Sequence, residues 1–257
     1  MPFVKTDDGQ EIYYQVQGVS GPLLICISGY FGISDLWKPL IANLGSSYRC
    51  LTFDSRGYGR SSKPEAPEAY SVVRSSEDVA TVINAAGLAD EACVLVTHSM
   101  GGNIASAYTL AHPKNVTGII YTATYYDGIN ISKFLPMSAL YDGADIPSKC
   151  VEFYTNMRCP EDIAHEAAKW PAYIRKNNAK ALYGFEMNGR YSQITVPTVI
   201  IQGEEDFAGP IDIAVKPMLA ELPSCTLKPL PGVCHFPPVE APAEVKRVIE
   251  EFLAGQK

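Results

Sequence analysis

The sequence predicts an α/β fold in which a mostly parallel sheet is covered by helices on both faces. Apolar runs without polar alternation, such as residues 22–27, are typical of strands buried on both faces. Segments with helical apolar periodicity alternate with these runs, which is the pattern of parallel sheets built from strand–helix units. Residues 93–106 show both features, because an apolar run, a tight turn and a small-residue helical segment follow each other without a spacer.

Composition narrows the classes of function. Of the 257 residues, 47% are hydrophobic and 19% are charged, which fits a globular protein with a sizeable core. The formal net charge of -7 argues against sequence-independent binding to nucleic acid and against binding to an anionic membrane surface. No apolar run approaches the ~18 residues that a membrane span needs, and residues 1–8 contain no signal-peptide core. Seven cysteines without a repeated spacing favour a reduced, cytoplasmic setting.

The individual elements follow from local patterns. Asp8-Gly9 is a hairpin-turn dipeptide that joins the first two strands. Apolar residues at helical spacing, such as Val79, Val82 and Ile83, mark the inward faces of the helices. The eight predicted strands span residues 3–5, 11–16, 22–27, 48–53, 93–96, 116–122, 196–201 and 226–230. The predicted helices span residues 35–44, 75–86, 100–112 and 241–254, with one more after Pro210.

The alternation of strands and helices breaks over residues 127–194. This stretch is rich in aromatic residues and methionine, and it has turn signals at Asp142-Gly143 and Asn188-Gly189. We expect a small helical cap here, inserted into a core that comprises residues 1–126 and 195–257. A cap over one edge of the sheet leaves a cleft with an apolar lining. The sequence therefore predicts a small-to-moderate hydrophobic or aromatic substrate.

Ser99 occupies the tight turn between the buried run and the small-residue helix. A turn this sharp strains the backbone of its middle residue, so the residues two positions away should be small. Gly101 meets that demand, whereas Thr97 meets it poorly. The helix that starts at Met100 directs backbone N–H groups toward the same place. Such pentads also occur by chance, so the interpretation of Ser99 as a nucleophile depends on the rest of the chain.

A serine nucleophile needs a base, and the base needs a group that orients it. Asp206 and His235 follow buried strands at the carboxyl edge of the predicted sheet, where Ser99 also emerges. We therefore predict His235 as the base and Asp206 as the orienting acid. Other carboxylates remain candidates for the acid: Asp127, Glu204, Glu205 and Asp212.

Four further loops carry recognisable motifs. They are Ser28-Gly29-Tyr30-Phe31-Gly32, the pattern Asp-x-Arg-Gly-x-Gly-x-Ser over residues 54–61, Gly203-x-x-Asp206-x-x-x-Pro210, and His235-Phe236-Pro237 followed by Glu240 and Pro242. Together with the Ser99 turn and the order serine, acid, histidine, they resemble the α/β-hydrolase fold superfamily. The resemblance covers essentially the whole chain.

The resemblance implies an acyl-transfer mechanism on an eight-stranded sheet. Ser99 would attack the substrate, His235 would act as base and then as acid, and Asp206 would orient His235. The backbone N–H groups of Tyr30 and Met100 would form the oxyanion hole. No metal and no organic cofactor are implied.

The chain departs from the family pattern at three positions. Thr97 replaces the first glycine of the serine turn, and Ser28 replaces the histidine of the oxyanion loop. Cys234 replaces the glycine that usually precedes the catalytic histidine. We interpret Cys234 as a small buried hydrophobic residue, because Ser99 already fills the position of the nucleophile. None of the three departures removes a catalytic group.

Other polar residues near these motifs have ordinary structural interpretations. His98 is expected to pack against the sheet, and His112 to cap the end of a helix. His165 lies in the predicted cap and should be exposed. Asp54 and Arg56 are expected to fix their loop and to take no part in catalysis.

The leading functional hypothesis is a serine hydrolase that acts on an ester, lactone or thioester of a small hydrophobic molecule. A second hypothesis keeps the triad but changes the reaction to C–C bond hydrolysis, or to a lyase, cyclase or acyl-transferase reaction. A third is a ligand-binding receptor with an unused triad. We expect no nucleic-acid or membrane partner, and the sequence leaves monomer and dimer open.

Overall fold

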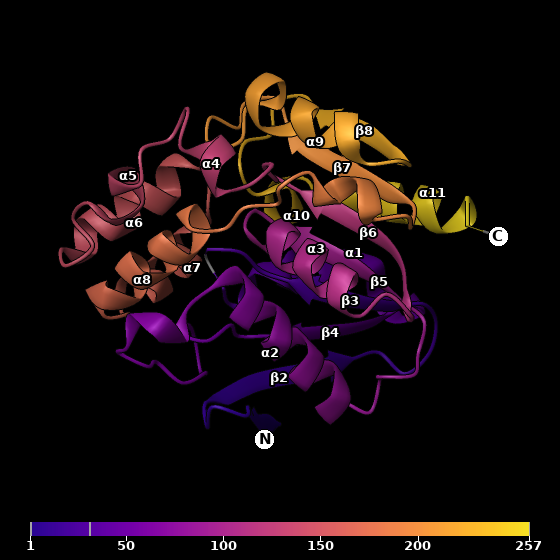
Figure 1. Ribbon diagram of the computed structural model, residues 1–257, viewed down its shortest axis with the longest axis horizontal. Coiled ribbons are helices and arrows are strands. Elements are labelled where there is room, and N and C mark those ends of the chain that lie inside the picture. The colour runs from indigo at the N-terminus through magenta and orange to yellow at the C-terminus, as the bar shows by residue number, and fades with distance from the viewer. Residues whose placement is uncertain (1, 31, 257) are drawn as a thin grey trace.

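The computed structural model of the protein describes residues 2–30 and 32–256 and contains an eight-stranded sheet (Figure 1). The strand order is β1-β2-β4-β3-β5-β6-β7-β8. The pairings β1–β2 and β2–β4 are antiparallel, and all pairings from β4 to β8 are parallel. The strands are β1 (Phe3–Lys5), β2 (Glu11–Gln17), β3 (Leu23–Ile27), β4 (Arg49–Phe53), β5 (Cys93–His98), β6 (Val116–Thr122), β7 (Thr198–Gly203) and β8 (Cys225–Leu230). The predicted mostly parallel sheet is confirmed.

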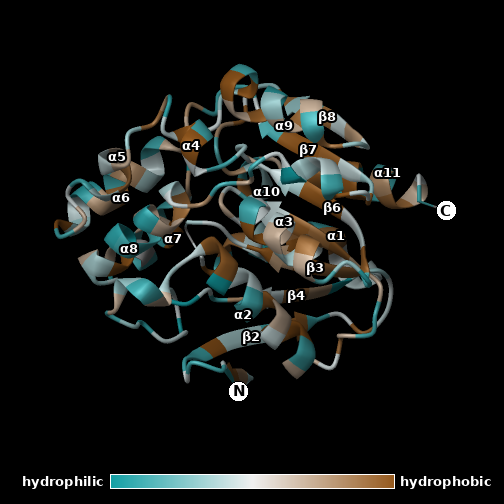
Figure 2. Cartoon of the chain, viewed as in Figure 1, coloured by the Kyte–Doolittle hydropathy of each residue, from teal (hydrophilic) through white to brown (hydrophobic). Residues whose placement is uncertain are grey.

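Helices cover both faces of the sheet. One face carries α2 (Val72–Ala85), α3 (Gly101–Ala111) and α9 (Lys216–Glu221), and the other carries α1 (Lys38–Leu44) and α11 (Pro242–Ala254) (Figure 1). Successive strand residues point to opposite faces. Leu24 therefore packs in the apolar cluster under α1 and α11, while Ile25 packs in the cluster under α2 and α3. Figure 2 shows the hydrophobic character of the central strands β6 and β7 between these layers.

The chain between β6 and β7 forms a group of short helices at one side of the sheet (Figure 1). They are α4 (Gly128–Ile131), α5 (Ser138–Tyr141), α6 (Pro147–Asn156), α7 (Glu161–Ala168), α8 (Ala172–Tyr183) and the 3-10 turn η4 (Arg190–Gln193). This segment contacts the loop after β3, because the Tyr30 hydroxyl donates to the carbonyl oxygens of Leu140 and Arg175, at 2.8 and 3.2 Å. The division of the chain into a core and a cap stays a prediction. None of the helices in the described part of the chain combines the length and apolar character that a bilayer crossing requires.

Some boundaries differ from those expected. The helix predicted from residue 75 begins at Val72, because the Ser71 hydroxyl caps it by accepting the N–H of Arg74 at 2.9 Å. The helix predicted over residues 35–44 is divided into the 3-10 turn η1 (Ser34–Trp37) and α1, with Pro39 near the start of α1. Other short turns are η2 (Gly45–Ser47), η3 (Pro67–Ala69), the π-helical turn η5 (Ile211–Val215) and α10 (Pro237–Glu240).

The loop after β4 is fixed by buried charges, as predicted for Asp54 and Arg56. Asp54 is fully buried and accepts the N–H of Ser34 at 2.8 Å and the Nε–H of Arg60 at 2.7 Å. Arg56, with 1% of its side chain exposed, forms a two-pronged ion pair with Asp78 of α2. Its Nε–Oδ2 and Nη2–Oδ1 distances are 2.6 and 2.8 Å. This pair joins the loop to the helix below it.

Replacing Arg56 with methionine is expected to lower the free energy of unfolding by about 3 kcal/mol, because buried Asp78 would keep only its longer contact with Arg74, at 3.5 Å. Urea unfolding followed by circular dichroism measures the loss. Arg247→Met is the matched control, since it breaks only exposed ion pairs on α11. Equal stability of Arg56→Met and the control would contradict the prediction.

Candidate active site

Ser99 lies at the turn between β5 and α3, with a left-handed φ of +53°. Its N–H donates to the carbonyl of Thr122 at 2.9 Å, which ties the turn to β6. A Cβ at Gly101 would collide with the carbonyl oxygen of Ile27, so this position requires glycine. Thr97 fits on the other side, fully buried, although its hydroxyl has no hydrogen-bond partner in the described part of the chain. The turn thus has the strained geometry that the sequence predicts.

His235 and Asp206 are in direct contact. The Nδ1 atom of His235 lies 3.0 and 2.9 Å from the two carboxylate oxygens of Asp206, and both residues are almost fully buried. Because an ionised carboxylate only accepts hydrogen bonds, Nδ1 carries the proton. The Nε2 atom of His235 then presents a lone pair, which is the form that a general base requires.

Asp206 is held in place by three further donors. Its Oδ1 accepts the N–H groups of Ala208 and Gly209 at 2.9 and 3.1 Å, and its Oδ2 accepts Nε2–H of Gln202 at 2.8 Å. Gln202 is fully buried near the end of β7 and also donates to the carbonyl of Gly209 at 2.7 Å. The sequence analysis missed Gln202. The sequence feature that could have indicated it is an amide side chain in a largely apolar strand, four residues before Asp206.

The alternative acids have other roles. The carboxylate of Asp127 caps α4 through the N–H of Asn130 at 2.9 Å and accepts the N–H of Met187 at 3.0 Å. Glu205 pairs with Arg158 at the surface, and Asp212 pairs with Lys216. Glu204 is exposed. Asp206 is the candidate that contacts His235.

His98, the residue before Ser99, links the serine turn to the histidine loop. Its Nε2–H donates to the backbone carbonyl of His235 at 2.8 Å, and the centres of the two rings lie 5.0 Å apart. The ring of His98 also stacks on Phe236 at 4.8 Å. Ser99 and His235 are therefore neighbours, although no hydrogen bond joins the Ser99 hydroxyl to His235 in this structure. Such bonds are often long in the free enzyme and tighten when substrate binds.

The backbone of the loop after β3 approaches the serine turn closely. A Cβ at Gly29 would collide with the N–H of Met100 and with the carbonyl of His98. Within the described part of the chain, the N–H groups of Tyr30 and Met100 donate no hydrogen bond to protein acceptors. They are free for a ligand oxygen. Phe31 of the same motif lies outside the described residues.

Ser28 fixes this loop in place of the histidine typical of the family. Its hydroxyl donates to the carbonyl of Ile33 at 3.1 Å and accepts the indole N–H of Trp37 at 2.8 Å. At the histidine loop, the Glu240 carboxylate accepts the N–H groups of Cys234 and Phe236 at 2.9 and 2.8 Å, one on each side of His235. Both loops are thus held by short polar contacts, and the departures at Ser28 and Cys234 leave them intact.

His98 makes the stability of the fold sensitive to acid. Burial, followed by the nearby charge of His235, lowers the pKa of His98 from 6.5 to about 3. As the pH drops from about 6.5 toward 3, His98 binds a proton in the unfolded chain but not in the folded chain. The free energy of unfolding therefore falls over this range. Unfolding free energies measured across this range should fall less steeply in His98→Asn than in the wild type. His165→Asn, at an exposed histidine, is the control, and an unchanged slope in His98→Asn would contradict the prediction.

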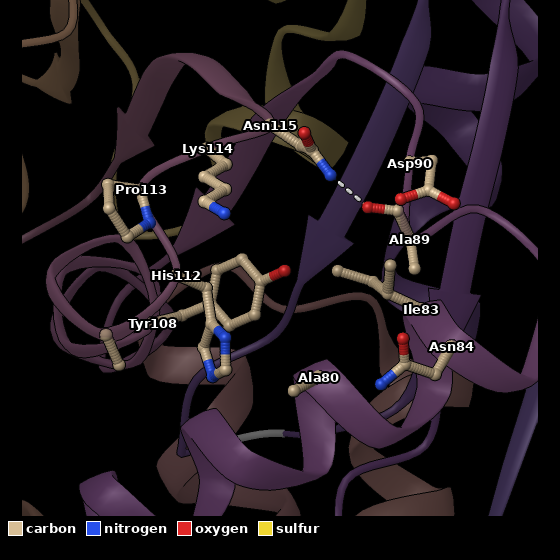
Figure 3. Close-up of a pocket in the computed structure, with 11 residues that line it drawn as sticks. Ala80, Ile83, Asn84, Ala89, Asp90, Tyr108, His112, Pro113, Lys114 and Asn115 are labelled. Atoms are coloured by element: carbon tan, nitrogen blue, oxygen red, sulfur yellow. Dashed lines mark hydrogen bonds between the residues drawn. The ribbon is translucent and has the colours of Figure 1, made fainter.

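A cavity of about 410 Å³ lies between the carboxyl-terminal ends of α2 and α3 (Figure 3). The side chains of Ile83, Asp90, Tyr108 and His112 contribute to its lining. His112 stacks on Tyr108, with ring centres 4.9 Å apart, at the end of α3. Because helices run antiparallel to the strands here, this cavity lies at the sheet edge opposite Ser99 and contains none of the predicted catalytic residues.

The sequence of the chain is similar to those of known proteins over nearly its whole length. Residues 22–145 match the family model for the alpha/beta hydrolase fold. The provisionally named carbamate hydrolase RutD of Variovorax paradoxus (strain S110) is 26% identical over 265 residues, which cover 95% of this chain and 96% of that protein. Epoxide hydrolase 1 of Caenorhabditis elegans is 26% identical over 277 residues, covering 94% of this chain and 67% of that protein.

Solved structures share the same architecture. The esterase EaEST of Exiguobacterium antarcticum is 22% identical and superposes with a TM-score of 0.84 over 98% of both chains. The enol-lactonase of Burkholderia xenovorans LB400 is 18% identical, with a TM-score of 0.80 over 98% of this chain and all of that one. The sheet order and these comparisons together define an enzyme of the hydrolase class. The chain has the α/β-hydrolase fold and is similar in sequence to proteins of that fold.

Proposed function

We propose that the protein is a serine hydrolase that cleaves an ester, lactone or thioester bond through an acyl-enzyme on Ser99. The observation that carries this proposal is the contact between His235 Nδ1 and the Asp206 carboxylate, next to a serine in left-handed geometry. In this arrangement a general base with a free Nε2 atom is held close to the turn that carries the Ser99 hydroxyl.

Each group then has a defined task. The Ser99 oxygen attacks the substrate carbonyl and forms a C–O bond while its proton moves to Nε2 of His235. The Asp206 carboxylate stabilises the imidazolium that forms, and the N–H groups of Tyr30 and Met100 hold the oxyanion. His235 passes the proton to the leaving group as the acyl-enzyme forms. Water, activated by His235, then releases the acid and restores Ser99.

The proposed substrate is hydrophobic or aromatic and of small to moderate size, and the proposed role of the helical segment is to cover it. Buried side chains of this segment that support an apolar environment include Tyr154, Met157, Trp170 and Ile174. A cytoplasmic location is part of the same proposal, supported by seven unpaired cysteine thiols.

Intact-mass analysis after treatment with a fluorophosphonate probe tests the nucleophile directly. We expect one adduct on the wild type and none on Ser99→Ala, because only an activated serine hydroxyl reacts with such a probe. A folded wild type that takes up no adduct would overturn the proposal in favour of a receptor with an unused triad. Product analysis with an added alcohol or amine then separates hydrolysis from acyl transfer.

A further inference from the structure

The side chain of Tyr30 joins the proposed oxyanion loop to the helical segment between β6 and β7. Its hydroxyl lies 2.8 Å from the carbonyl oxygen of Leu140 in α5 and 3.2 Å from that of Arg175 in α8. The side chain is 6% exposed, and burial raises the pKa of the hydroxyl above its ordinary value. The hydroxyl therefore keeps its proton near neutral pH and donates it to the helical segment.

The backbone of residue 30 has no polar anchor of its own. Within the described part of the chain, neither its N–H nor its carbonyl oxygen forms a hydrogen bond with a protein group. The loop is held on either side of it: Gly29 packs closely against the serine turn, and the carbonyl of Gly32 accepts the N–H of Ser55 at 2.7 Å. Between these two points, the hydroxyl of Tyr30 provides the polar contact that fixes the residue.

Arg175 holds the acceptor of this bond in place. Its Nη2 donates to the same carbonyl oxygen of Leu140 at 2.5 Å, and its side chain is 1% exposed. The guanidinium lies over the rings of Phe153 and Tyr154, 5.0 and 5.5 Å from their centres, and no carboxylate among the described residues pairs with it. Burying a cation without a counter-ion is unfavourable, which draws attention to the bond that it makes to Leu140.

We propose that the Tyr30 side chain is a positioning group: its hydroxyl, held through Leu140 and Arg175, sets the place of the Tyr30 backbone N–H in the oxyanion hole. This inference rests on the proposed function and gives the helical segment a part in the catalytic geometry as well as in covering the substrate. An oxyanion donor acts at about 2.7–3.1 Å from the developing charge. A small shift of residue 30 therefore weakens binding of the transition state more than binding of the substrate.

The test compares two variants that each lose one tyrosine hydroxyl between the helical segment and a core loop. Tyr30→Phe removes the bond to the oxyanion loop. Tyr173→Phe is the matched control, because the hydroxyl of Tyr173 in α8 donates to the carbonyl of Lys63, in the loop after β4, at 2.9 Å. We expect Tyr30→Phe to lower kcat on a 4-nitrophenyl ester by about 10- to 100-fold and to change KM by less than about 2-fold. Tyr173→Phe should keep the wild-type kcat, although both variants should lose some thermal stability.

The rate of labelling by the fluorophosphonate probe gives a second measurement. In this reaction the Ser99 oxygen bonds to phosphorus and fluoride leaves, while the oxyanion donors bind the phosphoryl oxygen. Tyr30→Phe should react more slowly than the wild type but reach the same adduct mass, because its nucleophile is intact. Arg175→Met should also lower kcat, and adding it to Tyr30→Phe should cost little more, since both act through Leu140.

The outcomes separate this inference from the proposed function. Wild-type kcat and labelling rate in Tyr30→Phe, or an equal loss of kcat in Tyr30→Phe and Tyr173→Phe, would overturn the inference and leave the hydrolase in place. Fully additive losses in the double variant would overturn the route through Leu140. A folded wild type with neither turnover nor adduct would overturn the proposed hydrolase, and the inference with it.

Discussion

Replacing Ser99 with alanine is expected to lower kcat for ester hydrolysis by about 10⁴-fold or more, since the acyl-enzyme can no longer form. Binding groups and the oxyanion donors would remain, so KM should change little. The fold should not suffer, because alanine occupies the same turn and Ser99 contributes its N–H, not its hydroxyl, to the hydrogen bond with Thr122. Steady-state kinetics on a 4-nitrophenyl ester, with thermal unfolding alongside, measures both effects.

The control for this experiment is Cys234→Ala. Cys234 is a second nucleophilic side chain next to a predicted catalytic residue, and its thiol donates to the carbonyl of Glu205 at 3.4 Å. Burial raises its pKa, which keeps it as an unreactive thiol. We expect Cys234→Ala to retain most of the activity. Loss of activity in Cys234→Ala together with retention in Ser99→Ala would reverse the assignment of the nucleophile.

Replacing Asp206 with asparagine is expected to lower kcat by about 10⁴-fold, the scale known for this change in serine protease triads. An amide can donate to Nδ1, which would move the proton of His235 to Nε2 and remove the lone pair that takes the serine proton. In the wild type, the Asp206 carboxylate also accepts hydrogen bonds from Gln202, Ala208 and Gly209. The substitution therefore also weakens the contacts that hold residue 206 in place.

Glu205→Gln is the matched control, since it changes the neighbouring acid from carboxylate to amide at the surface. It should keep near wild-type kcat. A folded Asp206→Asn variant with full activity would exclude Asp206 as the orienting acid.

The sheet and the contact between Asp206 and His235 could be predicted from the sequence, because both follow from local sequence patterns. Uninterrupted apolar runs identify buried strands, and Ser99, Asp206 and His235 each follow such a run. The order of the strands then brings their carboxyl ends together. Asp206 could be separated from Asp127 only by structure, since Asp127 proved to cap α4.

Contacts between distant parts of the chain could not be predicted from the sequence. His98 was expected to pack against the sheet, and its buried position agrees with this, but its bond to the carbonyl of His235 spans 137 positions. Gln202 and Arg175 gave no pattern that distinguishes a positioning amide or an unpaired cation from ordinary polar residues. The predicted apolar character of residues 127–194 also concealed the buried charge of Arg175. Such features depend on what surrounds a side chain, which composition does not record.

The left-handed geometry of Ser99 has a consequence for the evolution of this protein. A non-glycine residue in this region costs about 1–2 kcal/mol relative to a relaxed backbone, and glycine at position 99 would avoid that strain. Selection for stability and selection for the hydroxyl therefore oppose each other at this one residue. A protein that no longer used the hydroxyl could gain stability by replacing this serine with glycine, so only function makes the serine advantageous.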